Sequence, residues 1–391
     1  MNIKGTPCFL EVRTEYILAF LLVFSLSLTL TPVSSPVSYL PVFSVFILIT
    51  VLFLREPIIK ANRFYLGLFV VFSVVFGVSS LTNYSLAVSV RYISFLCFIC
   101  AAIFVVPRVI PLPRLLFTVS RFCIVLVVIG LLPYMVPGKS SVFGVSLWEA
   151  HLYWYPDLDP IKSIFTTPNG LGFITMVGSV ASFWEWWVYR NRAAVFLTAV
   201  NVLGLAMTNY RTGWICVSVA VAIFLVYSKF GRVFLVSCTA ISLILVSVIL
   251  LMMFSVVPGP EILTEMSLTR RKIRWRATIE AFKKKPFLGY GFGNTEEAVS
   301  TFRSDQYGNP HNSFLRLLAA SGVPGGILYT SIVIGTLVES IRETLDTRYI
   351  ILPSLLACFF LVQMFNSLSF IGVSMHSVFI SLSIGYYITG Y

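Results

Sequence analysis

The chain has 391 residues, of which 58% are hydrophobic and only 11% are charged, with a mean hydropathy of +0.90 and a formal net charge of +12. Soluble domains carry roughly 25% charged residues, and no soluble core could bury this much apolar surface. The composition therefore excludes a soluble globular protein and predicts an integral membrane protein whose apolar surface faces lipid.

Apolar runs recur along the whole chain. A helix needs about 20 apolar residues to cross a bilayer, and cutting the runs at charges and at Pro or Gly clusters predicts about twelve such helices. The expected fold class is an all-α polytopic transmembrane bundle, a single membrane domain over residues 1–391, with one large loop at 257–311 that contains short helices. The expected helices cover residues 15–31, 38–54, 64–80, 86–106, 115–136, 168–188, 193–209, 212–228, 232–256, 312–338, 349–366 and 370–389.

Basic residues in the short loops predict the orientation, because they resist translocation. They gather in alternate loops, and the loops at 32–37, 81–85 and 367–369 have none. Both termini are therefore expected in the cytoplasm and the 257–311 loop outside, because a long segment with nine basic residues obeys the rule only weakly. The predicted cytoplasmic residues are Lys4, Arg13, Arg55, Lys60, Arg63, Arg108, Arg114, Arg190, Arg192, Lys229, Arg232, Arg342 and Arg348.

Within that loop, residues 268–285 have the pattern of a helix. Trp275, Ile279 and Phe282 fall on one face, and cations cover much of the rest. One interpretation is an interfacial helix on anionic lipid; the other is that one or two cations bind a phosphate-bearing lipid substrate. The glycines of the G-Y-G-F-G run at 289–293 indicate loop geometry. A nucleotide-binding loop would follow a strand and would end in a Lys-Ser/Thr pair, and the sequence predicts neither here.

Two residues at helix ends have both a structural and a functional interpretation. His311 lies where the loop joins the tenth helix. It is either a capping residue or an imidazole that contacts a phosphate-bearing lipid and an acceptor. Arg211 is the only charge in its short hairpin, and it either reaches the headgroups or binds substrate.

Charges elsewhere are also candidates. Arg91, toward the outer side of the fourth helix, either contacts a diphosphate or reaches the headgroups, and Glu185 is expected to pair with a neighbouring arginine. Asp157 and Asp159 form a D-x-D pair of the kind that holds divalent metals, although the flanking prolines favour a turn or a sugar-contacting rim.

Three ordered stretches resemble the O-antigen ligases and the related O-antigen polymerases and protein O-oligosaccharyltransferases. They are Y-R-T-G-W at 210–214, Arg271 and Trp275 followed by P-F-L-G-Y-G-F-G at 286–293, and P-H-N-S-F-L at 310–315 with G-V-P-G at 322–325. The resemblance covers residues 165–330. It departs from the family where the loop is short and rich in arginine, so that Arg274 or Arg276 could stand in for Arg271.

The resemblance implies a GT-C-like fold and glycan transfer from a polyprenyl diphosphate carrier to an acceptor hydroxyl outside the cytoplasmic membrane. It implies a role in surface polysaccharide or lipopolysaccharide biosynthesis, without nucleotide sugar, cofactor or metal. The implied partners are the lipid-linked donor, a lipid, glycan or protein acceptor and the bilayer, and no nucleic acid is expected.

The resemblance also assigns roles to residues. Fixed guanidiniums stabilise the charge that builds on a leaving phosphate, and an imidazole suits the removal of a hydroxyl proton. The expected catalytic residues are Arg211, Arg271 and the base His311, and the expected substrate-binding residues are Arg91, Arg274, Arg276, Asn312 and Trp275.

Two other classes of protein remain open. A transporter or flippase of lipid-linked glycans would have a similar composition, although the two halves show no repeat of broken apolar segments. A scaffold without catalysis would not explain the ordered set of two arginines and a histidine.

Overall fold

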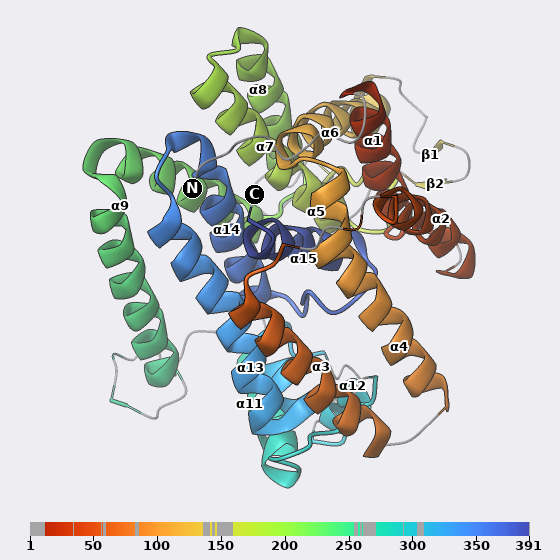
Figure 1. Cartoon of the computed structure of the whole chain (residues 1–391), viewed down its shortest axis with the longest axis vertical. Helices are drawn as coiled ribbons and strands as arrows, with labels where there is room; N and C mark the ends of the chain where they lie inside the picture. Colours follow the sequence, from red (N-terminus) through yellow and green to blue (C-terminus); the bar gives the residue numbers. More distant parts are fainter. Residues whose placement is uncertain are drawn as a thin grey trace. The chain divides into compact units, whose positions relative to one another are not determined.

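The computed structural model is built almost entirely from helices (Figure 1). It describes residues 12–33, 35–55, 57, 60–82, 86–135, 141–142, 145–146, 159–253, 257–258, 260, 271–291, 293–302 and 309–390. Every range that the sequence predicts as a helix contains one. The elements are α1 (Val12–Leu28), α2 (Ser35–Phe53), α3 (Arg63–Thr82), α4 (Leu86–Cys100), the π-helix η1 (Ala101–Val105), α5 (Val106–Val109), α6 (Leu112–Met135), the antiparallel pair β1 (Ser141–Val142) and β2 (Val145–Ser146), α7 (Pro168–Tyr189), α8 (Arg192–Met207), α9 (Arg211–Met253), α11 (Arg271–Lys284), α12 (Thr295–Ser300), α13 (Ser313–Glu343), the 3₁₀-helix η2 (Thr347–Tyr349), α14 (Ile351–Phe365) and α15 (Met375–Ile388).

Six helical segments in the described part of the chain are long and apolar enough to cross a membrane. Three shorter apolar helices add to them. These helices and the composition identify an integral membrane protein. The count of about twelve spans and the GT-C-like arrangement stay predictions. The six segments are Arg63–Thr82, Tyr92–Val109, Leu112–Met135, Arg211–Ile249, Ser313–Glu343 and Thr347–Phe365.

Two glycines interrupt long helices. Gly231, with φ 74°, lies at the predicted boundary between the helices at 212–228 and 232–256. Gly322, with φ 67°, interrupts α13, for which the sequence predicts one continuous helix over 312–338. Glycine adopts this left-handed conformation without the steric cost of a Cβ. The prediction of an unbroken tenth helix is therefore wrong.

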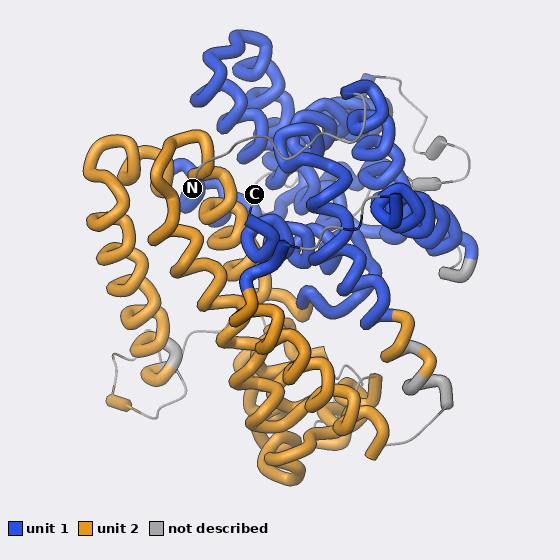
Figure 2. Tube along the Cα trace, in the orientation of Figure 1, with its two compact units in different colours: residues 1–62, 95–221, 369–391 blue, residues 63–94, 222–368 orange. Residues whose placement is uncertain are grey.

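The chain divides into two compact units (Figure 2). Unit 1 holds residues 1–62, 95–221 and 369–391, and unit 2 holds residues 63–94 and 222–368. Each unit is therefore assembled from segments that are distant in the sequence. The single membrane domain over 1–391 and the core over 165–330 stay predictions.

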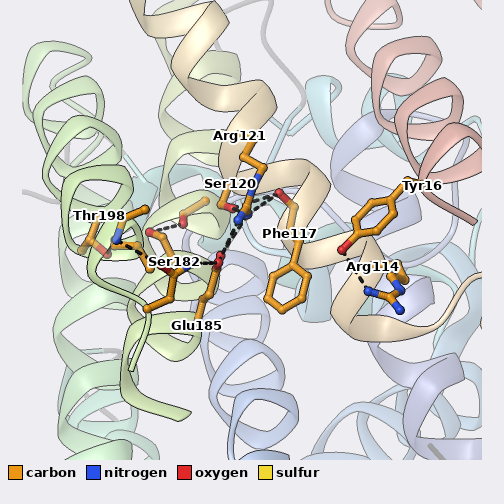
Figure 3. A network of polar contacts seen from close by, with 12 residues as sticks. Tyr16, Arg114, Phe117, Ser120, Arg121, Ser182, Glu185 and Thr198 are labelled. Carbon is orange, nitrogen blue, oxygen red and sulfur yellow. Dashed lines mark hydrogen bonds and ion pairs between the residues drawn. The ribbon is translucent and has the colours of Figure 1, made fainter. Parts of the chain in front are cut away.

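Unit 1 contains a buried carboxylate that is paired with an arginine (Figure 3). Glu185 on α7 is 3% exposed, and its oxygens accept hydrogen bonds of 2.9 and 2.8 Å from the guanidinium of Arg121 on α6. The side chain of Asn191, which caps α8, donates a third bond of 2.7 Å. Such partners are needed because burying an unpaired charge is very costly. The predicted pairing of Glu185 with an arginine is confirmed.

In unit 1, the basic connections that the charge pattern assigns to the cytoplasm lie close together. Arg108 donates hydrogen bonds to the carbonyls of Lys60 and Thr389, the second at 2.7 Å. Arg114, six residues further along the chain, pairs with Glu15 near the start of α1 at 3.2 Å. The basic connections therefore lie beside the first turns of α1 and the last turn of α15.

A second group of connections meets at the other end of α1. The N–H of Thr166, before α7, donates to the carbonyl of Leu30 at 2.8 Å, and the N–H of Met375 donates to Oγ1 of Thr29 at 3.1 Å. Within unit 1, the two sets of loops that the charge pattern distinguishes therefore lie at opposite ends of α1. Which set faces the cytoplasm stays a prediction.

In unit 2, α3 packs antiparallel to α13. Gly335, late in α13, lies against Tyr65 at the start of α3. Ser79, near the end of α3, donates a hydrogen bond of 2.7 Å to the carbonyl of Ala320, early in α13. The basic residues that begin α3 and end α13 therefore share one end of unit 2, and the segment that contains His311 lies at the other.

We expect the α7–α8 connection to face the cytoplasm and the segment around α12 to face out, because the basic residues of the short loops alternate. In a cysteine-free background, a membrane-impermeant thiol reagent should label Thr301→Cys in intact cells. It should label Ala193→Cys only after permeabilisation. Both positions are exposed. The reverse pattern of labelling would invert the topology.

Candidate functional site

Helix α11 packs against the segment before α13 through Trp275. This side chain is 1% exposed, and its Nε1–H donates to the carbonyl of Pro310 at 2.8 Å. Ala281 is also fully buried, whereas Ile279 and Phe282 are only half-buried. The apolar face that the sequence predicts therefore carries one buried residue, Trp275, and two half-buried ones. Small side chains allow a closer approach of helices.

Two arginines lie close to Trp275 on α11. Arg271 precedes Trp275 by four residues and precedes Arg274 by three, so the Arg271 side chain is next to both of them on the helix surface. The guanidinium carbon of Arg271 lies 6.0 Å from the centroid of the Phe365 ring. The Nε of Arg274 is buried and has no hydrogen-bond partner among the described residues. Arg276 is exposed to solvent or lipid.

His311 lies just before α13 in an unusual backbone conformation. Its φ is 50°, in the left-handed region, and its N–H donates to Oδ1 of Asn309 at 2.9 Å. The next residue, Asn312, caps the helix by accepting a 3.0 Å hydrogen bond from the N–H of Leu315. Its Nδ2 donates to the carbonyl of Met364 at 3.1 Å. Asn312 is therefore committed to internal contacts, and the imidazole is held at the helix start.

The imidazole of His311 lies in a field of positive charge. Burial, followed by the charges of Arg274 and Arg271, lowers the pKa of His311 from its ordinary value of 6.5 to about 4. All three effects disfavour the imidazolium. At neutral pH the ring is therefore uncharged and has a lone pair that can accept a proton. The site combines two fixed cations with a neutral base.

The break in α13 leaves two carbonyls without helical partners. The carbonyl of Ala320 would accept from residue 324, but Pro324 has no N–H. The carbonyl of Ala319 would accept from the N–H of Val323, which instead donates to the carbonyl of Pro286 at 2.8 Å. Within a membrane these two acceptors must find donors elsewhere in the protein.

The glycine loop after α11 supplies those donors. The N–H of Tyr290 donates to the carbonyl of Ala319 at 3.0 Å, and the N–H of Gly291 donates to that of Ala320 at 2.8 Å. Gly289 has φ 64°, and a Cβ there would lie 2.4 Å from the carbonyl carbon of Ala320. As predicted, these glycines serve loop geometry. The loop and the helix break interlock through their main chains.

An apolar groove of about 690 Å³ runs along α3 and α13 within unit 2. Near the start of α13 its walls are Phe314 and Leu318, which follow His311 within two helical turns. At its other end the groove reaches Tyr65 on α3. In a membrane such a lining favours hydrocarbon over water.

The motifs built into this geometry are those of a known family. Residues 193–330, about a third of the chain, match the family model described as O-antigen ligase. Over this range the chain is similar to the O-antigen ligases. The matched residues include α11, the glycine loop, His311 and the break in α13. No curated protein matches the chain.

The structure brings five of the predicted site residues together. Arg271, Arg274 and Trp275 on α11 lie with His311 and Asn312 in unit 2. The roles that the sequence assigns to them stay predictions. The internal hydrogen bonds of Trp275 and Asn312 make both part of the framework of the site.

Other predicted residues lie elsewhere. Arg211 is the exposed first residue of α9 and belongs to unit 1. Arg91 lies in α4, but its side chain is outside what the structure describes, as is Asp157. The main-chain carbonyl of Asp159 accepts a 2.6 Å hydrogen bond from the hydroxyl of Tyr134.

Three residues of the site are missing from the sequence prediction. Ser79 bonds the carbonyl of Ala320, and Asn309 and Ser367 surround the peptide before His311. The Asn-Pro pair at 309–310 carries a usable signal, because this dipeptide favours turns. The two serines carry none, since they lie far from the site in the sequence.

We expect Gly322→Ala to destabilise the protein and to reduce turnover. An alanine in the left-handed region costs about 1–2 kcal/mol. Its Cβ would also lie 2.2 Å from the carbonyl oxygen of Phe287, so the glycine loop would have to move. Thermal melting in detergent and a turnover assay check this.

Gly67→Ala on α3 is the matched control, because nothing lies within 4 Å of its Cβ position. An alanine in a helix interior is favoured over glycine by about 0.5–1 kcal/mol, so this variant should melt no lower than the wild type. Equal melting temperatures for the two variants would contradict the close contact at Gly322.

Proposed function

We propose that the protein transfers a glycan from a polyprenyl diphosphate carrier to an acceptor hydroxyl at the extracytoplasmic face of the cytoplasmic membrane. The match of residues 193–330 to the O-antigen ligase model supports a membrane enzyme of surface polysaccharide biosynthesis. The finer proposal rests on one observation. A neutral imidazole lies beside two arginines at the start of an apolar, membrane-length helix.

The proposed step is a displacement at the anomeric carbon of the transferred sugar. The acceptor oxygen forms a bond to that carbon, and the bond between the carbon and the diphosphate oxygen breaks. The electron pair leaves with the diphosphate, where Arg271 and Arg274 stabilise the growing negative charge. The hydroxyl proton moves to His311, and a general base of this kind contributes about 10² to 10⁴ in rate.

The low pKa of His311 is consistent with a site that binds an anion. A diphosphate bound at Arg271 and Arg274 would offset their charge and raise the pKa of the imidazole. The ring then becomes a stronger base once the donor is in place. Base strength is thereby coupled to donor binding.

The groove along α3 and α13 supports a lipid-linked donor. It begins near Phe314, three residues after His311, and its lining is predominantly apolar. A diphosphate at the arginines would thus place its hydrocarbon tail beside a surface that accepts it. No other part of the proposal requires this groove.

The other predicted residues enter the proposal on sequence grounds. Arg211 is proposed as a further catalytic guanidinium because of its motif, and Arg91 and Arg276 as contacts of the phosphate-bearing lipid. The proposed chemistry needs no metal and no cofactor. We therefore expect full turnover in the presence of excess chelator. Activity that returned only with Mg²⁺ or Mn²⁺, together with an inactive Asp157→Ala variant, would contradict this part.

We expect His311→Ala to lose about 10² or more in kcat while donor binding is retained, because a base acts chiefly in the transition state. In the wild type, kcat/KM should fall as the pH drops through about 4, since protonation removes the base of the free enzyme. The fall in kcat should come at a higher pH, because bound diphosphate raises the pKa.

Assays in proteoliposomes over a pH series check this, with His376→Ala as the histidine control. His376 lies in unit 1, where its ring packs edge-on against Phe173. Near wild-type turnover in His311→Ala would defeat the assignment of the base. A loss of donor binding in proportion to rate would make His311 a phosphate ligand.

We expect Arg271→Lys and Arg274→Lys to be strongly impaired, and Arg211→Lys with them. A lysine is a point charge and does not reproduce the planar, bidentate grip of a guanidinium on phosphate oxygens. Arg342→Lys is the matched control, because this exposed residue in the last turn of α13 lies at the end of unit 2 opposite His311. Its kcat/KM should change by less than about threefold. Equal effects in all four variants would indicate general lipid attraction instead of phosphate recognition.

A further inference from the structure

The backbone of His311 is held in a conformation that needs support. Its φ of 50° lies in the left-handed region, which costs a residue with a side chain about 1–2 kcal/mol. Residues in such conformations persist only when their surroundings fix them. The contacts that fix this one identify the residues that place the imidazole.

The peptide group between Pro310 and His311 is bonded at both of its polar ends. Its carbonyl oxygen accepts the 2.8 Å hydrogen bond from Nε1 of Trp275 on α11. Its N–H donates the 2.9 Å hydrogen bond to Oδ1 of Asn309. The orientation of this peptide plane determines φ of His311. The two bonds therefore set the direction in which the imidazole leaves the chain.

A third residue holds Asn309 in place. The hydroxyl of Ser367, which follows α14, donates a 2.5 Å hydrogen bond to the same Oδ1 of Asn309. The carbonyl of Ser367 in turn accepts a 3.1 Å hydrogen bond from Nη1 of Arg316 on α13. Arg316 also pairs with Glu296 on α12 at 3.5 Å. The N–H side of the peptide is thus tied to α12, α13 and the end of α14.

We infer that Trp275, Asn309 and Ser367 form a peptide clamp that positions His311 relative to the arginines of α11. This assigns Trp275 a positioning role in place of a substrate contact, because its ring is 1% exposed and its polar atom is used. The inference rests on the proposed function of His311. It predicts that damage to the clamp lowers kcat through His311 and leaves donor binding almost unchanged.

Three single variants test the clamp, each by deleting one of its polar groups. Trp275→Phe deletes the Nε1–H and keeps an aromatic ring, Asn309→Ala deletes the shared acceptor, and Ser367→Ala deletes the hydroxyl. Each should lower kcat by about tenfold, because small displacements of a catalytic group are costly, with a donor KM within about twofold of the wild type. Asn309→Asp and Ser367→Thr keep the acceptor and the hydroxyl, and they should recover most of the loss.

A double-mutant cycle separates positioning from general structural damage. In a His311→Ala background, the same three substitutions should change the residual kcat by less than about twofold, because the group that they position is gone. The residual turnover is measured with a radiolabelled lipid diphosphate donor. Equal losses in both backgrounds would overturn the clamp, as would a donor KM that rises in step with the loss of kcat.

The His311→Ala variant alone distinguishes a failure of the clamp from a failure of the proposed function. If it keeps most of its turnover, His311 is not the base, and both the proposed function and the clamp are overturned. If it loses about 10² in kcat while the cycle is additive, the base is supported and only the clamp is overturned.

Discussion

The functional part of unit 2 depends on one constraint: a helix that breaks within a membrane must satisfy its freed carbonyls inside the protein. Gly322 permits the break, and Pro324 ensures that the carbonyl of Ala320 cannot be satisfied by its own helix. The glycine loop donates to these carbonyls, and Ser79 adds a further donor from α3. Since the loop follows α11 directly, the position of the arginines is tied to that of the broken helix.

Arg274 in unit 2 and the paired arginines of unit 1 have different electrostatic surroundings. In unit 1, Arg121 and Arg114 bond directly to carboxylates, and such pairs are structural. In unit 2, Arg274 makes no ion pair with any described carboxylate, and its charge lowers the pKa of His311 instead. The charge of this guanidinium is not neutralised by a described carboxylate, so it can stabilise a bound anion such as a phosphate. This difference supports the proposed role of Arg274 and His311.

The sequence predicts features that depend on local pattern. Apolar length predicts the long apolar helices, and the charge of Glu185 in an apolar run predicts its pairing with an arginine. The motif order leads to the family whose model matches residues 193–330. The break in α13 is not visible in this way, because its apolar run is as long as an unbroken helix. The burial of Ala277 and Ala281 on α11 is also not predicted, since the pattern of large apolar residues singles out Trp275, Ile279 and Phe282. The clamp depends on tertiary contacts that no local pattern encodes.

The residues that match the family are not structurally self-sufficient. Arg271, Arg274 and His311 all lie within the matched residues 193–330, but several of the contacts that support them come from outside that range. Ser79 belongs to α3 and Ser367 to the segment after α14, and the carbonyl of Met364 accepts from the cap of α13. These outside contacts are needed because the two halves of α13 end in polar main-chain groups, which require partners from neighbouring helices. Helices whose sequences show only apolar character therefore determine the geometry of the site, through single hydroxyls and carbonyls at their ends.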